Sequence, residues 1–148
     1  MKDPQQALRD KYLSLLTGAI SVNGTDYLAV YADFVPSTAD RPYIFLSQQT
    51  VGDARTGNCP SSDCTILADI VWQAQGNLAR TSEVNHIASQ VIEALSALNA
   101  RPTNDLGGFE VNRHYLESSN TLNESNGSHV IIRRLLRFRD LVFETVTT

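Results

Sequence analysis

Long apolar runs are missing from this sequence. No stretch approaches the roughly 20 consecutive apolar residues of a transmembrane helix, so we expect no membrane span and no membrane partner. The opening residues, MKDPQQALRDKYL, lack the uninterrupted apolar core of a signal peptide, which favours synthesis in the cytoplasm. With 148 residues and no internal repeat or linker, residues 1–148 are predicted to form one domain with its own hydrophobic core.

An excess of positive charge is also missing. The chain has 12 Lys and Arg against 16 Asp and Glu, which gives a formal net charge of −4. A general nucleic-acid-binding domain is normally basic and carries a familiar recognition motif, and neither property is present. We therefore expect no specific binding of nucleic acid.

Metal ligands and catalytic motifs are few. The chain has two cysteines, Cys59 and Cys64, and three histidines spread over distant segments. A structural zinc site usually takes four ligands, often from closely spaced Cys/His pairs, and no second pair occurs. The GxGxxG, P-loop, HExxH and GxSxG patterns are absent as well. We expect no metal, no cofactor, no catalytic residue and no enzymatic activity.

Both cysteines occur in one turn-rich stretch, 59-CPSSDC-64, and three interpretations of it stay open. A disulfide between Cys59 and Cys64 is sterically possible, although a cytoplasmic protein would normally hold the thiols reduced. Two free thiols in a turn is the simplest alternative. A catalytic thiol would need a neighbouring base, and no local signature identifies one.

The spacing of apolar residues predicts an α+β fold. Helices are expected over 4–19 and 81–98, with a hairpin over 19–34 around Asn23-Gly24. Four further strands are expected over 43–51, 65–75, 109–119 and 129–146. Links that look like hairpins predict a single, mainly antiparallel β-sheet with two helices packed on one face. A long protruding hairpin loop, 52–64, and an exposed tip, 120–128, complete this prediction.

Two strands carry the sharpest patterns. The run Ile66 to Trp72 is almost unbroken apolar sequence, which predicts burial on both faces or contact with another subunit. In 133-RRLLRFR-139, strand alternation places Arg134, Leu136 and Phe138 on one face and Arg133, Leu135, Arg137 and Arg139 on the other. These arginines would contact a partner, or would pair with nearby carboxylates on a solvated face.

Four stretches together resemble the tail-terminator or tail-completion proteins of long-tailed bacteriophages. They are the N-terminal DPQQALRDKYLSLL, the Val-Pro link and strand of 35–51, the Trp-bearing strand, turn and helix of 70–97, and the Arg-rich closing strand of 132–143. The order of these pieces matches over most of the chain. The stretch CPSSDC is not part of the pattern.

The resemblance implies a virion protein without enzymatic activity. Such proteins form rings, usually hexamers, which cap the head-proximal end of the tail tube and contact the tube protein and the neck or connector. DNA passes through the lumen without specific binding. A closed ring of identical subunits needs two different complementary patches on each subunit. The residues that we expect at interfaces are Arg55, Asp63, Ile70, Trp72, Arg133, Arg134, Arg137 and Arg139.

Three alternatives remain open at the level of sequence. A neck or head-completion protein of the same virion has no feature that separates it from a terminator. A small cytoplasmic enzyme would use the thiol of Cys59 or Cys64. A ligand-binding module would be built around Trp72.

Overall fold

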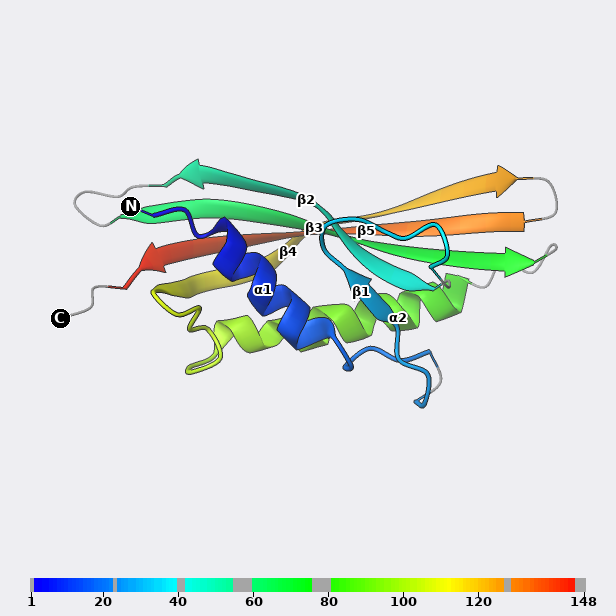
Figure 1. Cartoon of the computed structure of the whole chain (residues 1–148), viewed down its shortest axis with the longest axis horizontal. Helices are drawn as coiled ribbons and strands as arrows, with labels where there is room; N and C mark the ends of the chain where they lie inside the picture. The colour runs from blue at the N-terminus through cyan, green and yellow to red at the C-terminus, as the bar shows by residue number, and fades with distance from the viewer. Residues whose placement is uncertain are drawn as a thin grey trace.

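A computed structural model describes residues 2–22, 24–39, 42–54, 60–75, 81–126 and 129–145. One sheet and two helices make up the fold (Figure 1). The helices are α1 (Gln5–Leu16) and α2 (Thr81–Leu95), and α2 continues into a short 3-10 turn, η1 (Ser96–Asn99). The strands are β1 (Ala29–Tyr31), β2 (Tyr43–Asp53), β3 (Ser61–Gln75), β4 (Phe109–Asn126) and β5 (His129–Glu144).

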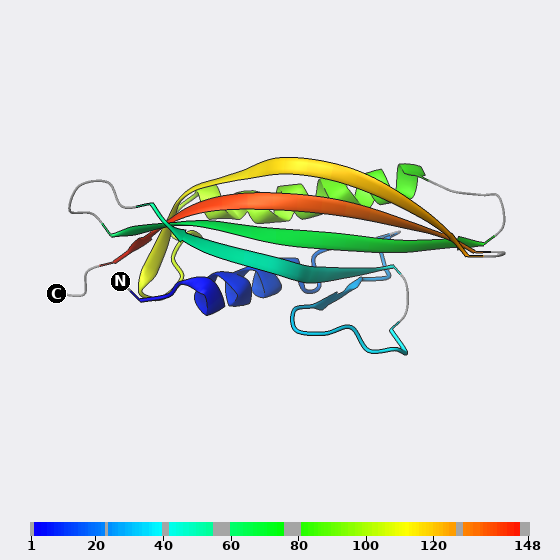
Figure 2. The same ribbon diagram turned by 90° about the horizontal axis from the view of Figure 1, so that it is seen from above.

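The sheet has the strand order β1-β2-β3-β5-β4. Pairing of β2 with β3, β3 with β5 and β5 with β4 is antiparallel, and only the short β1 joins β2 in parallel. Figure 2 looks onto the four long strands, with α2 behind them. The predicted α+β class, with a mainly antiparallel sheet and two helices, is confirmed.

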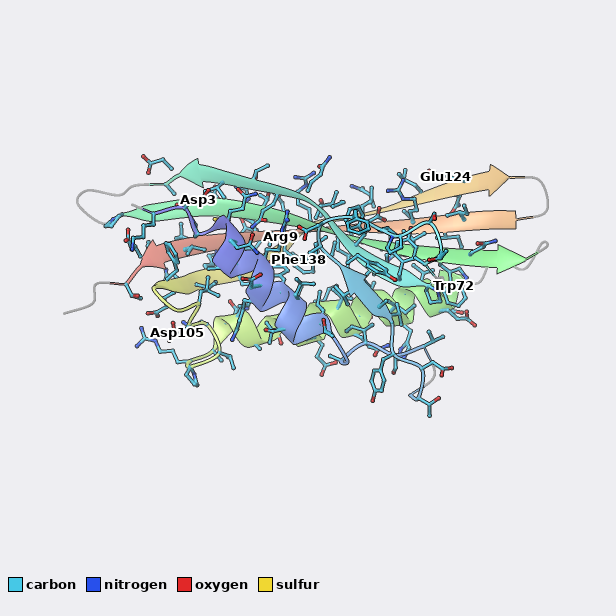
Figure 3. The ribbon with its side chains drawn as sticks, in the orientation of Figure 1. Asp3, Arg9, Trp72, Asp105, Glu124 and Phe138 are labelled. Atoms are coloured by element: carbon cyan, nitrogen blue, oxygen red, sulfur yellow. The ribbon has the colours of Figure 1, made fainter. Side chains whose placement is uncertain are left out.

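Each helix buries an apolar stripe against the sheet. Helical spacing over 4–19 predicts a stripe of Leu8, Tyr12, Leu15, Leu16 and Ala19; of these, Leu8, Tyr12 and Leu16 are buried, whereas Leu15 is half-buried and Ala19, beyond the end of α1, is exposed. The Asp3 carboxylate at the start of α1 (Figure 3) accepts a hydrogen bond from the Gln5 N–H at 2.9 Å. The predicted stripe of the second helix is buried along its whole length, comprising Val84, Ile87, Ala88, Val91, Leu95 and Leu98. These stripes meet the sheet on one face.

Alternation along the strands supplies the other half of the core. On β3 the residues that face the helices include Cys64, Ile66, Ala68 and Ile70, each at most 1% exposed. Directly opposite on β5 lie further buried side chains, among them Leu136 and Phe138. The predicted division of the Arg-rich strand into two faces is therefore confirmed.

Three local predictions need correction. The hairpin over 19–34 reduces to one antiparallel bridge, Ser21 with Tyr27, followed by the three-residue β1, so three strands rather than four precede α2. The predicted loop 52–64 is strand at both ends, because β2 runs to Asp53 and β3 begins at Ser61. The predicted tip 120–128 is strand as far as Asn126. Cross-strand hydrogen bonds thus extend through Ser- and Asn-rich sequence that is typical of turns.

A buried polar cluster ties α1 to the sheet. The two oxygens of the Asp140 carboxylate accept hydrogen bonds from Tyr12 Oη at 2.5 Å and from His114 Nδ1 at 2.6 Å. The side chain of Asp140 is fully buried, and that of His114 is 4% exposed. The stacked rings of His114 and Phe138, with centroids 5.3 Å apart, close the cluster from one side. Burial raises the pKa of Tyr12 well above its usual value, and the Asp140 charge adds to the shift.

The Asp140→Ala variant should be strongly destabilised. It leaves the Tyr12 hydroxyl and the His114 N–H buried without their acceptor, and losing one member of such a buried network costs about 3–5 kcal/mol. The Asp33→Ala variant is the control, because the Arg9–Asp33 ion pair is exposed and worth about 1 kcal/mol or less. Urea unfolding followed by circular dichroism measures both, and similar free energies of unfolding for the two variants would contradict this role.

Candidate assembly surface

One face of the sheet is not covered by the described helices. Strand register brings a continuous set of side chains to this face, which we call the open face. Its central members are Asp63, Leu67, Asp69 and Val71 on β3, Arg133, Leu135, Arg137, Arg139 and Leu141 on β5, and Glu117, Leu122 and Glu124 on β4. The open face therefore unites residues far apart in the sequence.

Two ion-pair clusters lie on the open face. Arg139 Nη1 lies 2.6 Å from Asp63 Oδ2, and Arg139 Nη2 lies 2.8 Å from Glu117 Oε1. Arg133 pairs with Asp69 and lies 3.6 Å from Glu124 Oε1. Each cluster thus holds one β5 guanidinium between a carboxylate of β3 and a carboxylate of β4. The hydrogen bonds that Arg133 donates to Asp69 and that Arg139 donates to Glu117 raise the pKa of each arginine above its usual value.

Asp69 is recessed within this face. Its side chain is 1% exposed, although no described helix covers it. Phe45 of β2 and Leu135 of β5 lie directly opposite Asp69 in the register and flank its carboxylate. The Oδ1 atom of Asp69 has no hydrogen-bond partner among the described residues. A buried carboxylate in this position makes Arg133 important for stability.

Arg137 lies between the two clusters on the open face. It is half-buried, lies opposite Leu67 of β3, and takes part in no ion pair or side-chain hydrogen bond among the described residues. Half-buried Leu135 and Leu141 lie on the same strand face. Apolar side chains with an arginine at the centre and paired charges around them have the composition of a protein–protein interface.

The other expected interface residues lie elsewhere. Ile70, Trp72 and Arg134 belong to the face that the helices cover. Ile70 is fully buried in the core, Trp72 is half-buried against it, and the guanidinium of Arg134 donates a hydrogen bond to Asn85 of α2. Arg55 lies outside the described residues. The structure thus places Asp63, Arg133, Arg137 and Arg139 on one face of the sheet and Ile70, Trp72 and Arg134 on the other.

Sequence reasoning missed the carboxylates that complete the clusters. Asp69, Glu117 and Glu124 occur on two strands other than β5, so no local spacing connects them with the arginines. One signal was available, since Asp69 is the single charge within the apolar run Ile66 to Trp72. A charge in such a run is expected to have a partner.

Cys64 is a core residue and not a surface thiol. Its side chain is fully buried on the helix-covered face of β3. Burial raises the pKa of the Cys64 thiol from 9.0 to about 12, and the neighbouring Asp140 adds to the shift. A nucleophilic cysteine needs the opposite shift together with access to solvent. Cys59 lies outside the described residues, so a disulfide between Cys59 and Cys64 stays one of the open interpretations.

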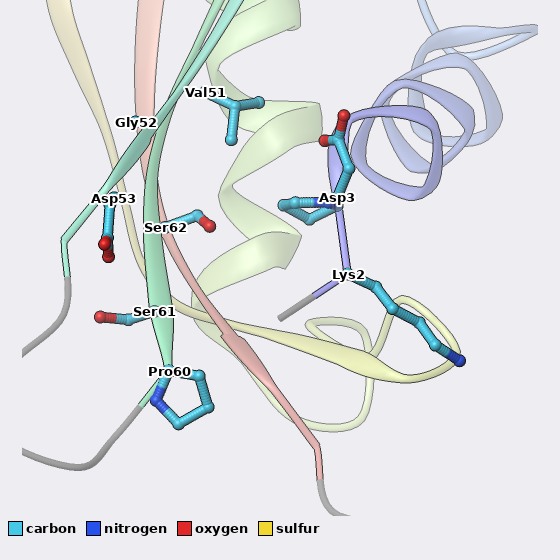
Figure 4. Close-up of a pocket in the computed structure, with 9 residues that line it drawn as sticks. Lys2, Asp3, Val51, Gly52, Asp53, Pro60, Ser61 and Ser62 are labelled. Atoms are coloured by element: carbon cyan, nitrogen blue, oxygen red, sulfur yellow. The ribbon is translucent and has the colours of Figure 1, made fainter.

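The pocket in Figure 4 lies between the start of α1 and the adjoining ends of β2 and β3. Its volume is about 260 Å³, and its lining includes Lys2, Asp3, Asp53, Ser61 and Ser62. No described lining residue is a histidine or cysteine. Across the described ranges, no cluster of three or more His, Cys, Asp or Glu side chains is arranged to hold a metal ion. No described helix is long and apolar enough to cross a membrane.

The molecule is thus a small α+β domain whose most distinctive surface is an open sheet face. No protein-family model and no curated protein matches the chain. A solved structure does match, namely a chain of the "Virion of native gene transfer agent (GTA) particle". The two superpose with a TM-score of 0.71 at 17% identity, over 93% of this chain and 96% of that chain. The two chains share a fold over nearly their whole lengths.

Arg133→Ala should be destabilising and Arg137→Ala nearly neutral. The first change leaves the buried Asp69 carboxylate unpaired, which costs about 1–3 kcal/mol. The second removes a guanidinium that has no partner within the described residues, so the change should stay within about 0.5 kcal/mol. Both residues lie on the same face of β5, which makes them a matched pair for denaturant unfolding. If both variants lost the same free energy of unfolding, the burial of the Asp69 carboxylate would not depend on its ion pair with Arg133.

The Cys64 thiol should make the folded state less stable in alkali. Below pH 9 the thiol is protonated in both states, whereas between pH 9 and about 12 only the unfolded chain ionises, so stability falls as pH rises. In a Cys59→Ser background, the free energy of unfolding should fall by about 1 kcal/mol more between pH 8 and 10 than in the same chain carrying Cys64→Ala. An identical fall in both chains would contradict the raised pKa.

Proposed function

We propose that this chain is a structural protein of a phage or phage-like virion that assembles into a ring and caps the head-proximal end of the tail tube. The resemblance of its sequence to tail terminators implies a ring of six copies. The observation that carries this proposal is the shared fold with a chain of a gene transfer agent virion, which spans nearly all of both chains. Because the match covers 93% of this chain and 96% of that chain, the two proteins share a whole fold and not only a fragment of one.

The organisation of the surface supports an assembly role. The open face combines half-buried leucines with charges that are mostly paired within the subunit, which lowers the cost of removing it from water. Arg133 and Arg139 are engaged by carboxylates and are therefore poorly placed to hold phosphates. This suits a ring through which DNA passes without specific binding.

The chemistry of the described residues gives an enzyme little support. The His114–Asp140 pair resembles part of a catalytic triad, but it is enclosed between α1 and the sheet, and Tyr12 occupies the second carboxylate oxygen. Cys64 is buried with a raised pKa. Neither group can meet a substrate without opening the core.

The shape of the sheet gives a ring subunit two ends for two partners. The β2–β3 hairpin and the β4–β5 hairpin lie at opposite ends of the long strands (Figure 1). In the ring, one end would contact the tail tube protein and the other the neck or connector. Neighbouring copies would then meet through surfaces between these two ends, among them the open face.

Electron microscopy of the purified protein, alone and mixed with its tail tube protein, tests this proposal. We expect rings of uniform diameter that bind one end of the tube and stop its growth. Persistent monomers that bind neither tube ends nor neck proteins would overturn it. Rings that bind the head connector but leave tube length uncontrolled would assign the chain to the neck instead.

A further inference from the structure

The segment around β1 exposes two large aromatic side chains. Tyr27 is 61% exposed and Phe34 is 71% exposed, and they lie on either side of β1 (Ala29–Tyr31). We call residues 26–36 the aromatic connector. Exposed aromatic rings are enriched at the centres of protein–protein interfaces, where they contribute a large share of the binding energy.

Contacts with the rest of the fold hold the connector in place. Its strand pairs with β2, and the ring of Tyr31 packs edge-on against Tyr43 with centroids 5.7 Å apart. The residue before Phe34, Asp33, accepts a hydrogen bond from Arg9 Nη1 of α1 at 3.0 Å. Phe34 is thus presented from an anchored segment, and docking it would cost little ordering entropy.

The open face offers a chemical match for such a ring. Its carboxylates pair with Arg133 and Arg139, and the guanidinium near its centre that has no ion pair among the described residues is that of Arg137. A guanidinium stacks well on an aromatic face, and half-buried Leu67 and Leu135 would enclose the ring edges. The Phe34 ring itself adds no charge to a face already rich in carboxylates.

The connector also lacks charges that would repel Arg137. Between Lys11 and Arg41 the sequence has no Lys or Arg, while Asp26 and Asp33 lie within the connector. A two-fold contact centred on Arg137 would instead place two guanidinium groups opposite each other. Figure 2 places the connector beyond the β2 edge and clear of the open face, so one copy can present its connector to the open face of another. This arrangement is head-to-tail, as ring closure requires.

We propose that the aromatic connector of one copy of this chain docks on the open face of the next copy, with Phe34 stacked against Arg137. This contact would be the repeating junction of the ring, and the inference therefore rests on the proposed ring-forming function. The partner on this face is a second copy of the chain.

Two single variants and their mixture test the junction. Phe34→Ala removes the ring but keeps the open face, whereas Arg137→Glu alters the open face but keeps the connector. Each variant alone should associate more weakly than the unmodified chain by more than about tenfold. Ile92→Ala is the matched control, because Ile92 is an exposed apolar residue on α2 outside both surfaces. Sedimentation velocity measures the association.

A mixture of the two variants should form one junction per pair of subunits and no further contacts of this kind. The intact connector of Arg137→Glu can dock on the intact open face of Phe34→Ala, so 1:1 heterodimers should form without larger rings. Rings formed by either variant alone, or a mixture that stays monomeric, would overturn the junction while leaving ring formation by the unmodified chain intact. If the unmodified chain itself never forms rings, then the proposed function fails as well. Circular dichroism confirms that each variant is folded.

Discussion

The antiparallel pairing of β3 with β5 is the interaction on which the rest of the structure depends. It runs over all 15 residues of β3, from Ser61 opposite Phe143 to Gln75 opposite His129. Because side chains alternate along a strand, this single register decides which residues meet the helices and which form the open face. A slip of one residue would move Phe138 and Asp140 out of the core and bring Arg137 and Arg139 into it. The core and the open face are therefore two consequences of one register.

The patterns within single elements could be predicted from the sequence, but the links between elements could not. The apolar stripe of α2 and the alternation along β5 are local, and the structure bears them out. The lengths of the hairpins do not follow from local sequence, because pairing with a neighbouring strand extends the sheet through Ser- and Asn-rich residues such as Asn120 and Asn123. The buried cluster of Tyr12, His114 and Asp140 joins three elements across more than a hundred residues of sequence, and no spacing rule signals it.

On the open face, too, the local pattern could be predicted from the sequence but the contacts between strands could not. Strand alternation alone places Arg133, Arg137 and Arg139 on one face, but their different roles depend on the neighbouring strands. Carboxylates from β3 and β4 engage the outer two arginines, whereas Arg137 faces Leu67. The two paired arginines hold carboxylates of β3 and β4 in place on the open face, and Arg137, which has no ion pair among the described residues, is the position that we propose for recognition. In the proposed ring, an anchored aromatic side chain of the neighbouring copy would fill that position.

Hydroxyl-radical footprinting of the assembled protein and its dissociated subunits tests most directly whether the open face is the assembly surface. Mass spectrometry then compares the labelling of Leu135, Leu141 and Phe143, which lie on that face, with that of Ile92 on α2. Assembly should protect the three β5 side chains and leave Ile92 as reactive as in the free subunit. Protection of Ile92 with unchanged labelling of the β5 residues would place the contact on the helices and contradict an open-face interface.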